Sequence, residues 1–379
     1  MTADPSATRG GIAACPSAPH RSVLGLVRAA MGRPVGPDLA RDLAASDPEA
    51  LVRIATYAYV HVVVASAFDF QPALARAVPD DLVIYFREMQ AANRTRNAEI
   101  ASQIRQIGAR FSALGIRGIV LKGGAHLLSP MYPDPSFRFL SDLDILVPAA
   151  EIDRAQAELV AFGAEPGEIS EIDRDPHHHL APLWHPDWPV MVELHRRMGQ
   201  GDLRDFLAPD AVIASAVDTR EPGLSVPAPE YRLMHAVQHA QLQPPRHRDR
   251  QLSLRDVVEV EVMLASMTED DVGHARAAFG QRHAAAWAGL DAARAMIFGD
   301  AAEIGSLPPG ARRWADEALA DFGRPGSRRL ATAGRWAGWY AKEFLTNPAR
   351  RRHYLEERRR AGGLRRLLAQ QRERWRRTR

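Results

Sequence analysis

One segment, residues 116–147, constrains the fold more than any other part of this 379-residue chain. It contains a short β-branched run, a Lys-Gly-Gly turn, and then an alternating stretch that includes Asp142 and Asp144. Because successive side chains of a strand point to opposite faces, the two aspartates are predicted to share one face. Leu143 and Ile145 are then predicted to turn toward a core. The segment therefore predicts an α/β unit with two carboxylates on one strand.

A second short apolar run supplies a third acid. Within residues 189–195, Glu193 interrupts the hydrophobic pattern at an alternate position, and His195 falls on the same strand face. Carboxylate oxygens are the ligands that Mg²⁺ prefers in proteins. We therefore predict a metal site built from Asp142, Asp144 and Glu193, with His195 orienting Glu193 or contacting substrate.

The use of lysine points to phosphate. The chain contains two lysines, Lys122 and Lys342, whereas arginine supplies every other long cation. An ammonium is a compact charge that approaches a phosphate where a planar guanidinium fits poorly, so Lys122 is predicted to serve chemistry; chance survival is the alternative. The amides of Gly123 and Gly124, at the start of a predicted helix, can receive phosphate oxygens. Arg138 can neutralise a phosphate, although an arginine before a strand is equally often a surface residue.

Short apolar runs and turn residues outline the secondary structure. Strands are predicted at 116–121, 139–147 and 190–194, and helices at 123–128 and 149–162. Helical, alanine-rich spacing dominates before and after this part of the chain. Four regions follow: a helical N-terminal region with a flexible start, a core, a C-terminal helical domain and an arginine-rich helical tail, at residues 1–95, 96–215, 216–349 and 350–379.

Cysteine content and hydropathy bear on the compartment. Cys15 is the single cysteine, so no internal disulfide can form and a reducing compartment is expected. The start of the sequence lacks the pattern of a secretory signal. The longest apolar run, residues 57–70, contains His61 and is too short to span a bilayer as a helix, so it is predicted to be a buried helix. We expect a cytoplasmic protein without a transmembrane segment.

Charge is distributed unevenly along the chain. Residues 350–379 contain thirteen arginines and three glutamates, although the net charge of the whole chain is only +3. Such a tail can dock on nucleic acid or on an anionic membrane surface through phosphate contacts. A solvated helix with leucines packed on the body explains the same composition, and both interpretations stay open.

Histidines form two further groups. His235 and His239 have the spacing of zinc ligands on a helix, but Ala236 stands where a metalloprotease carries its glutamate, which excludes that class. A structural role, with one histidine bonded to Asp256, and a substrate-facing role both remain. In the run of residues 177–179 the three side chains cannot all face one way, and His179 is favoured to lie near the site.

Together these features resemble a known family. The Lys-Gly-Gly turn, the spacer with Tyr132, the Arg138–Val147 stretch and the Val-Glu-Leu-His of residues 192–195 are similar to uncharacterised bacterial nucleotidyltransferases related to the polymerase-beta superfamily. The resemblance is strongest over residues 116–148. It extends more weakly to about residue 260, where such relatives carry a histidine and later an aspartate, matched here by His239 and Asp256.

The resemblance implies an α+β fold with a polymerase-beta-like core and a small mixed sheet, flanked by helical regions. It also implies Mg²⁺ dependence, with two ions and Mn²⁺ as an alternative, and an NTP such as ATP as donor. The nucleotide site is then assigned to Lys122, Gly123, Gly124, Arg138 and Ser141. One departure is that the superfamily usually carries a Gly-Ser pair where this chain has two glycines, which leaves the donor nucleotide open.

The leading hypothesis is transfer of a nucleotidyl group from an NTP to a hydroxyl acceptor by a two-metal mechanism. The acceptor can be a small molecule, a peptide or RNA. The alternatives are a catalytically degenerate protein that binds a nucleotide or nucleic acid, and an RNA-modifying enzyme of the toxin type.

Overall fold

The computed structural model describes residues 11–167, 179–200, 203–243 and 246–324. The elements described below belong to one compact unit that ends at Gly323. The first ten residues, where the predicted flexible start begins, lie outside the described residues, as do His177, His178 and the predicted arginine-rich tail.

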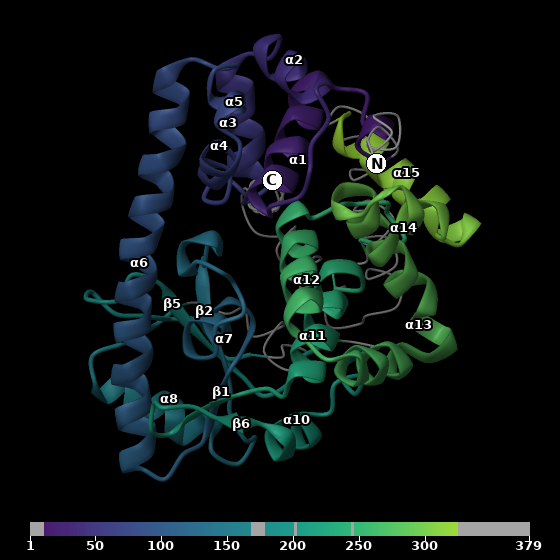
Figure 1. The fold of residues 1–379 in the computed structure, drawn as a ribbon. Helices are drawn as coiled ribbons and strands as arrows, with labels where there is room; N and C mark the ends of the chain where they lie inside the picture. Colours follow the sequence, from purple (N-terminus) through teal and green to yellow (C-terminus); the bar gives the residue numbers. More distant parts are fainter. Residues whose placement is uncertain (1–10, 168–178, 201–202, 244–245, 325–379) are drawn as a thin grey trace, which may run out of the picture. The chain divides into compact units, whose positions relative to one another are not determined.

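The chain begins with short helices (Figure 1). The run of residues 57–70 was predicted to be one buried helix, and that prediction was wrong. The run instead contains the last residue of α3, a turn with buried side chains, and α4. Helix α3 ends because Tyr59 takes a left-handed backbone conformation with φ of 56°. The bounds are η2 Ile12–Ala14, α1 Ala18–Ala30, α2 Asp38–Ala44, α3 Pro48–Tyr57, α4 Ala65–Phe70 and α5 Pro72–Ala75.

The long helix α6, Asp80–Ala113, contacts α4 near one end and α8 and β7 further along the chain (Figure 1). It ends at Ala113, and Gly115 just beyond the last turn adopts a φ of 68°. Since α6 contacts both α4 and the core, it joins the N-terminal helices to the sheet.

A seven-stranded mixed sheet follows, in the order β3-β4-β5-β2-β1-β7-β6. Two neighbouring pairs, β2–β5 and β1–β7, are parallel, and the other pairs are antiparallel. The predicted α+β class with a mixed sheet is therefore confirmed. The strands are β1 Gly118–Val120, β2 Asp142–Leu146, β3 Glu165–Pro166, β4 Leu183–Trp184, β5 Met191–His195, β6 Val217–Asp218 and β7 Leu224–Val226.

Buried side chains of the strands belong to two hydrophobic cores. Leu143 and Ile145 of β2 are fully buried in a core that α6 and α8 also line, as the alternating pattern predicts. A second core joins side chains of α1, such as Val23, to side chains of α13 and α15. The elements between the strands are α7 Lys122–Leu128, η3 Pro135–Phe137, α8 Ile152–Ala161 and α10 Pro209–Ser215.

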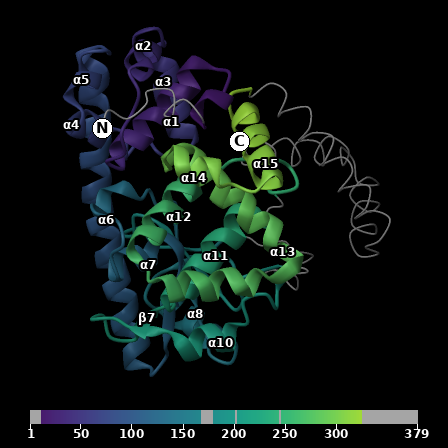
Figure 2. The ribbon, with the colours of Figure 1, turned by 45° about the vertical axis from the view of Figure 1, so that its right-hand side comes forward.

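The last helices begin with α11, which contacts α7 and packs against α12 and α13 (Figure 2). No described helix is both long and apolar enough to cross a membrane. The helices are α11 Pro229–Gln241, α12 Leu254–Ser266, α13 Glu269–Phe298, α14 Ala301–Gly305 and α15 Pro309–Phe322.

Candidate active site

Two parallel strands place the acids side by side. Asp144 of β2 pairs in register with Glu193 of β5, and His195 lies two residues further on the same face. One ligand atom from each of these three residues lies within 4.8 Å of the others. Asp142, one step earlier on that face, is half-buried. Burial, and then the charge of Asp144, raise the pKa of Asp142.

Asp144 is the centre of this cluster. Its Oδ1 accepts hydrogen bonds from Lys122 Nζ and from His195 Nε2, both at 2.7 Å. Burial opposes ionisation, but Lys122 and His195 outweigh it and hold the pKa of Asp144 well below its usual range. The carboxylate is therefore ionised at neutral pH although only 2 % of the residue is exposed.

The Lys-Gly-Gly turn forms the first turn of α7, directly after β1. Lys122 adopts a φ of 47°, and both glycines are buried. A Cβ on Gly124 would stand 2.7 Å from Leu143 and 2.8 Å from Val120. A larger residue at position 124 would therefore have to displace side chains of β1 and β2, whether or not the Gly124 amide meets a phosphate.

Arg138 and Ser141 sit in different surroundings. Arg138 is 7 % exposed, and its Nη2 lies 2.9 Å from Glu259 Oε2. Ser141 is exposed, and its hydroxyl donates to Asp142 Oδ1 at 3.2 Å. The surface alternative considered for Arg138 is therefore wrong, because a buried carboxylate holds this arginine inward.

A pocket opens beside Lys122. Arg232, His235 and His239 enter it from one face of α11, at helical spacings of three and four residues. Arg232 and Glu259 were not predicted as site residues, although their spacing from His235 and Asp256 marked two polar helix faces. The lining residues are Lys122, Arg138, Pro227, Arg232, His235, Ala236, His239, Asp256, Glu259 and Met263.

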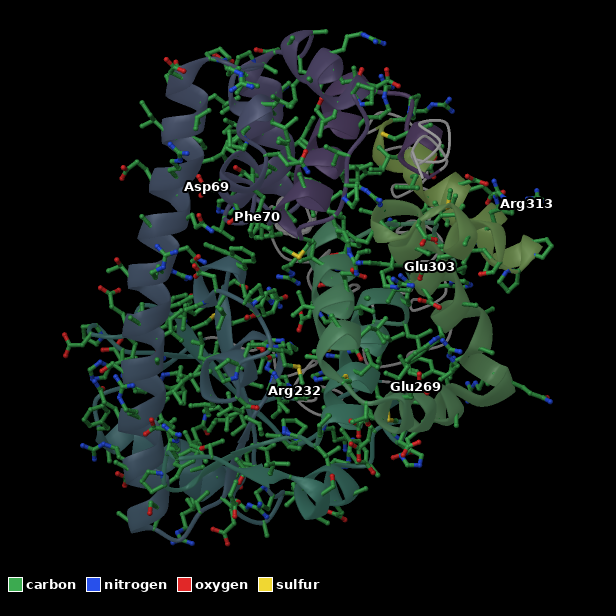
Figure 3. The ribbon with its side chains drawn as sticks, in the orientation of Figure 1. Asp69, Phe70, Arg232, Glu269, Glu303 and Arg313 are labelled. Carbon is green, nitrogen blue, oxygen red and sulfur yellow. The ribbon has the colours of Figure 1, made fainter. Side chains whose placement is uncertain are left out.

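A buried polar network fixes one wall of the pocket. Arg232 reaches from α11 to α7, where its Nη2 donates to His126 Nδ1 at 2.8 Å (Figure 3). Because Nδ1 accepts, the neutral ring carries its proton on Nε2, which lies 3.2 Å from Glu259 Oε1. Burial lowers the pKa of His126 to about 4. Arg138, His126 and Glu259 thus connect α7 and the segment before β2 with α12.

His235 and His239 of α11 both line the pocket. His239 Nδ1 lies 3.6 Å from Asp256 Oδ2, and both residues line the pocket, so the structural and the substrate-facing interpretations are compatible. Burial holds the pKa of His235 well below its ordinary value, so this ring is neutral at pH 7. His179 lies with its Nε2 3.8 Å from Glu193 Oε2.

The structure therefore brings Lys122, Asp144, Glu193 and His195 into one cluster.

Comparisons with known proteins bear on the function of this cluster. A family model described as an uncharacterised nucleotidyltransferase matches residues 44–296. No curated protein matches the chain. Among solved structures, the solution structure of the antibiotic-resistance factor ANT(2'')-Ia matches with 15% sequence identity and a TM-score of 0.35, covering 49% of this chain and 93% of that chain.

Proposed function

The chain belongs to this family of uncharacterised nucleotidyltransferases, and we propose that it transfers a nucleotidyl group from an NTP to a hydroxyl acceptor. The observation that carries the proposal is the pairing of Asp144 with Glu193 across two parallel strands, with the Lys122 ammonium on the same carboxylate. Acids held on adjacent strands next to a buried cation suit chemistry on phosphate.

The donor set fits a divalent cation. Two carboxylates and an imidazole lie within reach of one ion, and oxygen ligands suit Mg²⁺ and Mn²⁺ while imidazole is more usual for the transition metals. We assign Asp142, Asp144 and Glu193 as ligands of two Mg²⁺ ions, with Mn²⁺ as the alternative. When bound, such ions lower the pKa of the attacking hydroxyl and offset the charge of the phosphates.

The chain's own cations would hold the triphosphate. Lys122, Arg138 and Arg232 line one pocket, and Arg232 is only 5 % exposed, so its charge acts in a poorly solvated wall. Burial lowers the pKa of Arg232 to about 10, at which it is still charged at pH 7.

In this proposal the predicted core, residues 96–215, supplies the acids, and the predicted C-terminal helical domain, residues 216–349, supplies the pocket wall. His239 and Asp256 then face the acceptor, and the cytoplasm is the compartment. The arginine-rich tail keeps its two interpretations, nucleic-acid docking and a solvated helix.

Calorimetric titration of the four NTPs, with and without Mg²⁺, tests the proposal. Wild type should bind at least one NTP only when Mg²⁺ is present, and Asp144→Asn should abolish that binding. Asp205→Asn is the matched control, because it makes the same change at a side chain that is 85% exposed. Equal binding by wild type and Asp144→Asn would contradict the proposed site. NTP binding without pyrophosphate release across a panel of hydroxyl acceptors would favour a binding protein.

A further inference from the structure

Tyr59 occupies a backbone position that tyrosine fills poorly. Its N–H bonds to Thr56 O at 3.0 Å and the next N–H, of Val60, bonds to Ala55 O at 2.9 Å, which closes the end of α3. Tyr59 itself takes a φ of 56°, and glycine is the usual occupant of such a position. The local fold therefore gives no reason for a tyrosine here.

Burial does not explain this side chain either. Tyr59 is 45% exposed, although it lies beside the fully buried turn that joins α3 to α4. A strained backbone that carries an exposed ring is more typical of a functional position than of a packing one.

The ring of Tyr59 belongs to a cluster of aromatic and guanidinium groups. Its centroid lies 5.9 Å from that of Phe139, with 30° between the ring planes. The guanidinium carbon of Arg255 lies 5.2 Å from the Tyr59 ring, and that of Arg96 lies 4.8 Å from the Phe139 ring. We call Tyr59, Phe139 and Arg255 the aromatic platform.

The aromatic platform adjoins the candidate active site on two sides. The carbonyl of Phe139 accepts a bond of 2.8 Å from Arg138, which lines the pocket, and Asp142 follows three residues later. Arg255 Nε donates to Asp256 Oδ1 at 3.1 Å, and Asp256 also lines the pocket. The platform thus collects side chains from the turn after α3, the segment before β2 and the first turn of α12.

We propose that the aromatic platform binds the nucleobase of the donor NTP, with Tyr59 and Phe139 stacking on it and Arg255 beside them. This rests on the proposed function. Every base offers a π-face to an aromatic ring, and a guanidinium adds attraction to the stack. A planar group joined to an anion matches an exposed aromatic ring whose neighbours, Phe139 and Arg255, contact two residues of the cation-lined pocket. The N-terminal helices thereby contribute to donor binding.

Replacing Tyr59→Asn tests the platform, because asparagine accepts the left-handed backbone that tyrosine strains. The melting temperature should stay equal or rise, while the affinity for ATP with Mg²⁺ should fall between about fivefold and a hundredfold. The affinity for inorganic tripolyphosphate with Mg²⁺, which lacks a base, should be unchanged. Tyr57→Ala is the matched control, since this side chain is 51% exposed and lies two residues away, and it should bind both ligands as wild type does. Phe139→Leu, which keeps an apolar side chain, should also weaken ATP and spare tripolyphosphate.

The outcomes separate the two proposals. If Tyr59→Asn binds ATP as wild type does, the platform is overturned and the proposed function stands. If Tyr59→Asn weakens ATP and tripolyphosphate equally, the ring has a structural role and the platform is also overturned. If the variant loses affinity for a single-stranded oligoribonucleotide while its affinity for ATP is unchanged, the donor assignment is overturned. If wild type binds neither tripolyphosphate nor any of the four NTPs, both proposals fail.

Discussion

Replacing Lys122→Met separates the two cations that can serve Asp144. In the structure the ammonium lies 2.7 Å from a carboxylate oxygen whose residue is 2 % exposed. Removing one partner of a buried ion pair costs about 3–5 kcal/mol. Because His195 still donates to the same oxygen and a quarter of the lysine side chain is exposed, we expect the lower figure of about 2–3 kcal/mol without metal.

Thermal unfolding with and without Mn²⁺ measures this effect. In the presence of a chelator, Lys122→Met should melt about 3–4 °C below wild type. Mn²⁺ at a hundred times its Kd should restore about 2.7 kcal/mol, and the variant should bind it more tightly than wild type because no ammonium competes for Asp144. Arg41→Met is the control, since its side chain is 77% exposed. A variant that melts with wild type in chelator, or that gains less from Mn²⁺ than wild type does, would refute the reasoning.

Three further predictions concern the walls of the site. Glu259→Gln leaves the buried Arg138 without its charge partner and should lower the free energy of unfolding by about 3–5 kcal/mol in urea titrations; a loss below about 1 kcal/mol would contradict the network. Burial lowers the pKa of His126 in the folded protein to about 4, whereas the same ring in the unfolded chain is protonated at a higher pH. Protonation therefore favours the unfolded state, and the stability should fall as the pH drops from about 6.5 toward 4.5. His126→Gln should flatten that slope in pH-dependent urea titrations, and an unchanged slope would exclude His126 as its source. Gly124→Ala places a Cβ 2.7 Å from Leu143 and should destabilise the protein by about 1–3 kcal/mol, measured by calorimetric melting; an unchanged melting temperature would show that α7 can shift freely.

Local patterns predicted much of the core, because they are set by neighbouring residues. The alternation of Asp142 to Leu146 predicted β2 and its buried face. The pairing of Asp144 with Glu193 depends on strand order, which no local pattern contains. The break at Tyr59 was missed because the sequence around it contains no glycine to mark the end of a helix. Tyr59 adopts the left-handed backbone conformation that glycine usually takes, so the apolar run was predicted as one helix.

The partners of the arginines in the pocket could not be predicted from the sequence. Arg138 reads as a surface arginine or a phosphate ligand until Glu259, more than a hundred residues later, is seen 2.9 Å away. Arg232 likewise gains its role only when α11 lies against α7. Side chains that act across packed helices depend on tertiary contacts, so their types alone do not reveal their partners.

In the proposed function, the acids on β2 and β5 hold the metal at which an NTP reacts. Anomalous diffraction from crystals grown with Mn²⁺ and a non-hydrolysable ATP analogue tests it most directly. The account predicts a manganese peak bound by Asp144 and Glu193, with the triphosphate beside Lys122. Manganese and nucleotide bound elsewhere, with the Lys122–Asp144 pair intact, would contradict it.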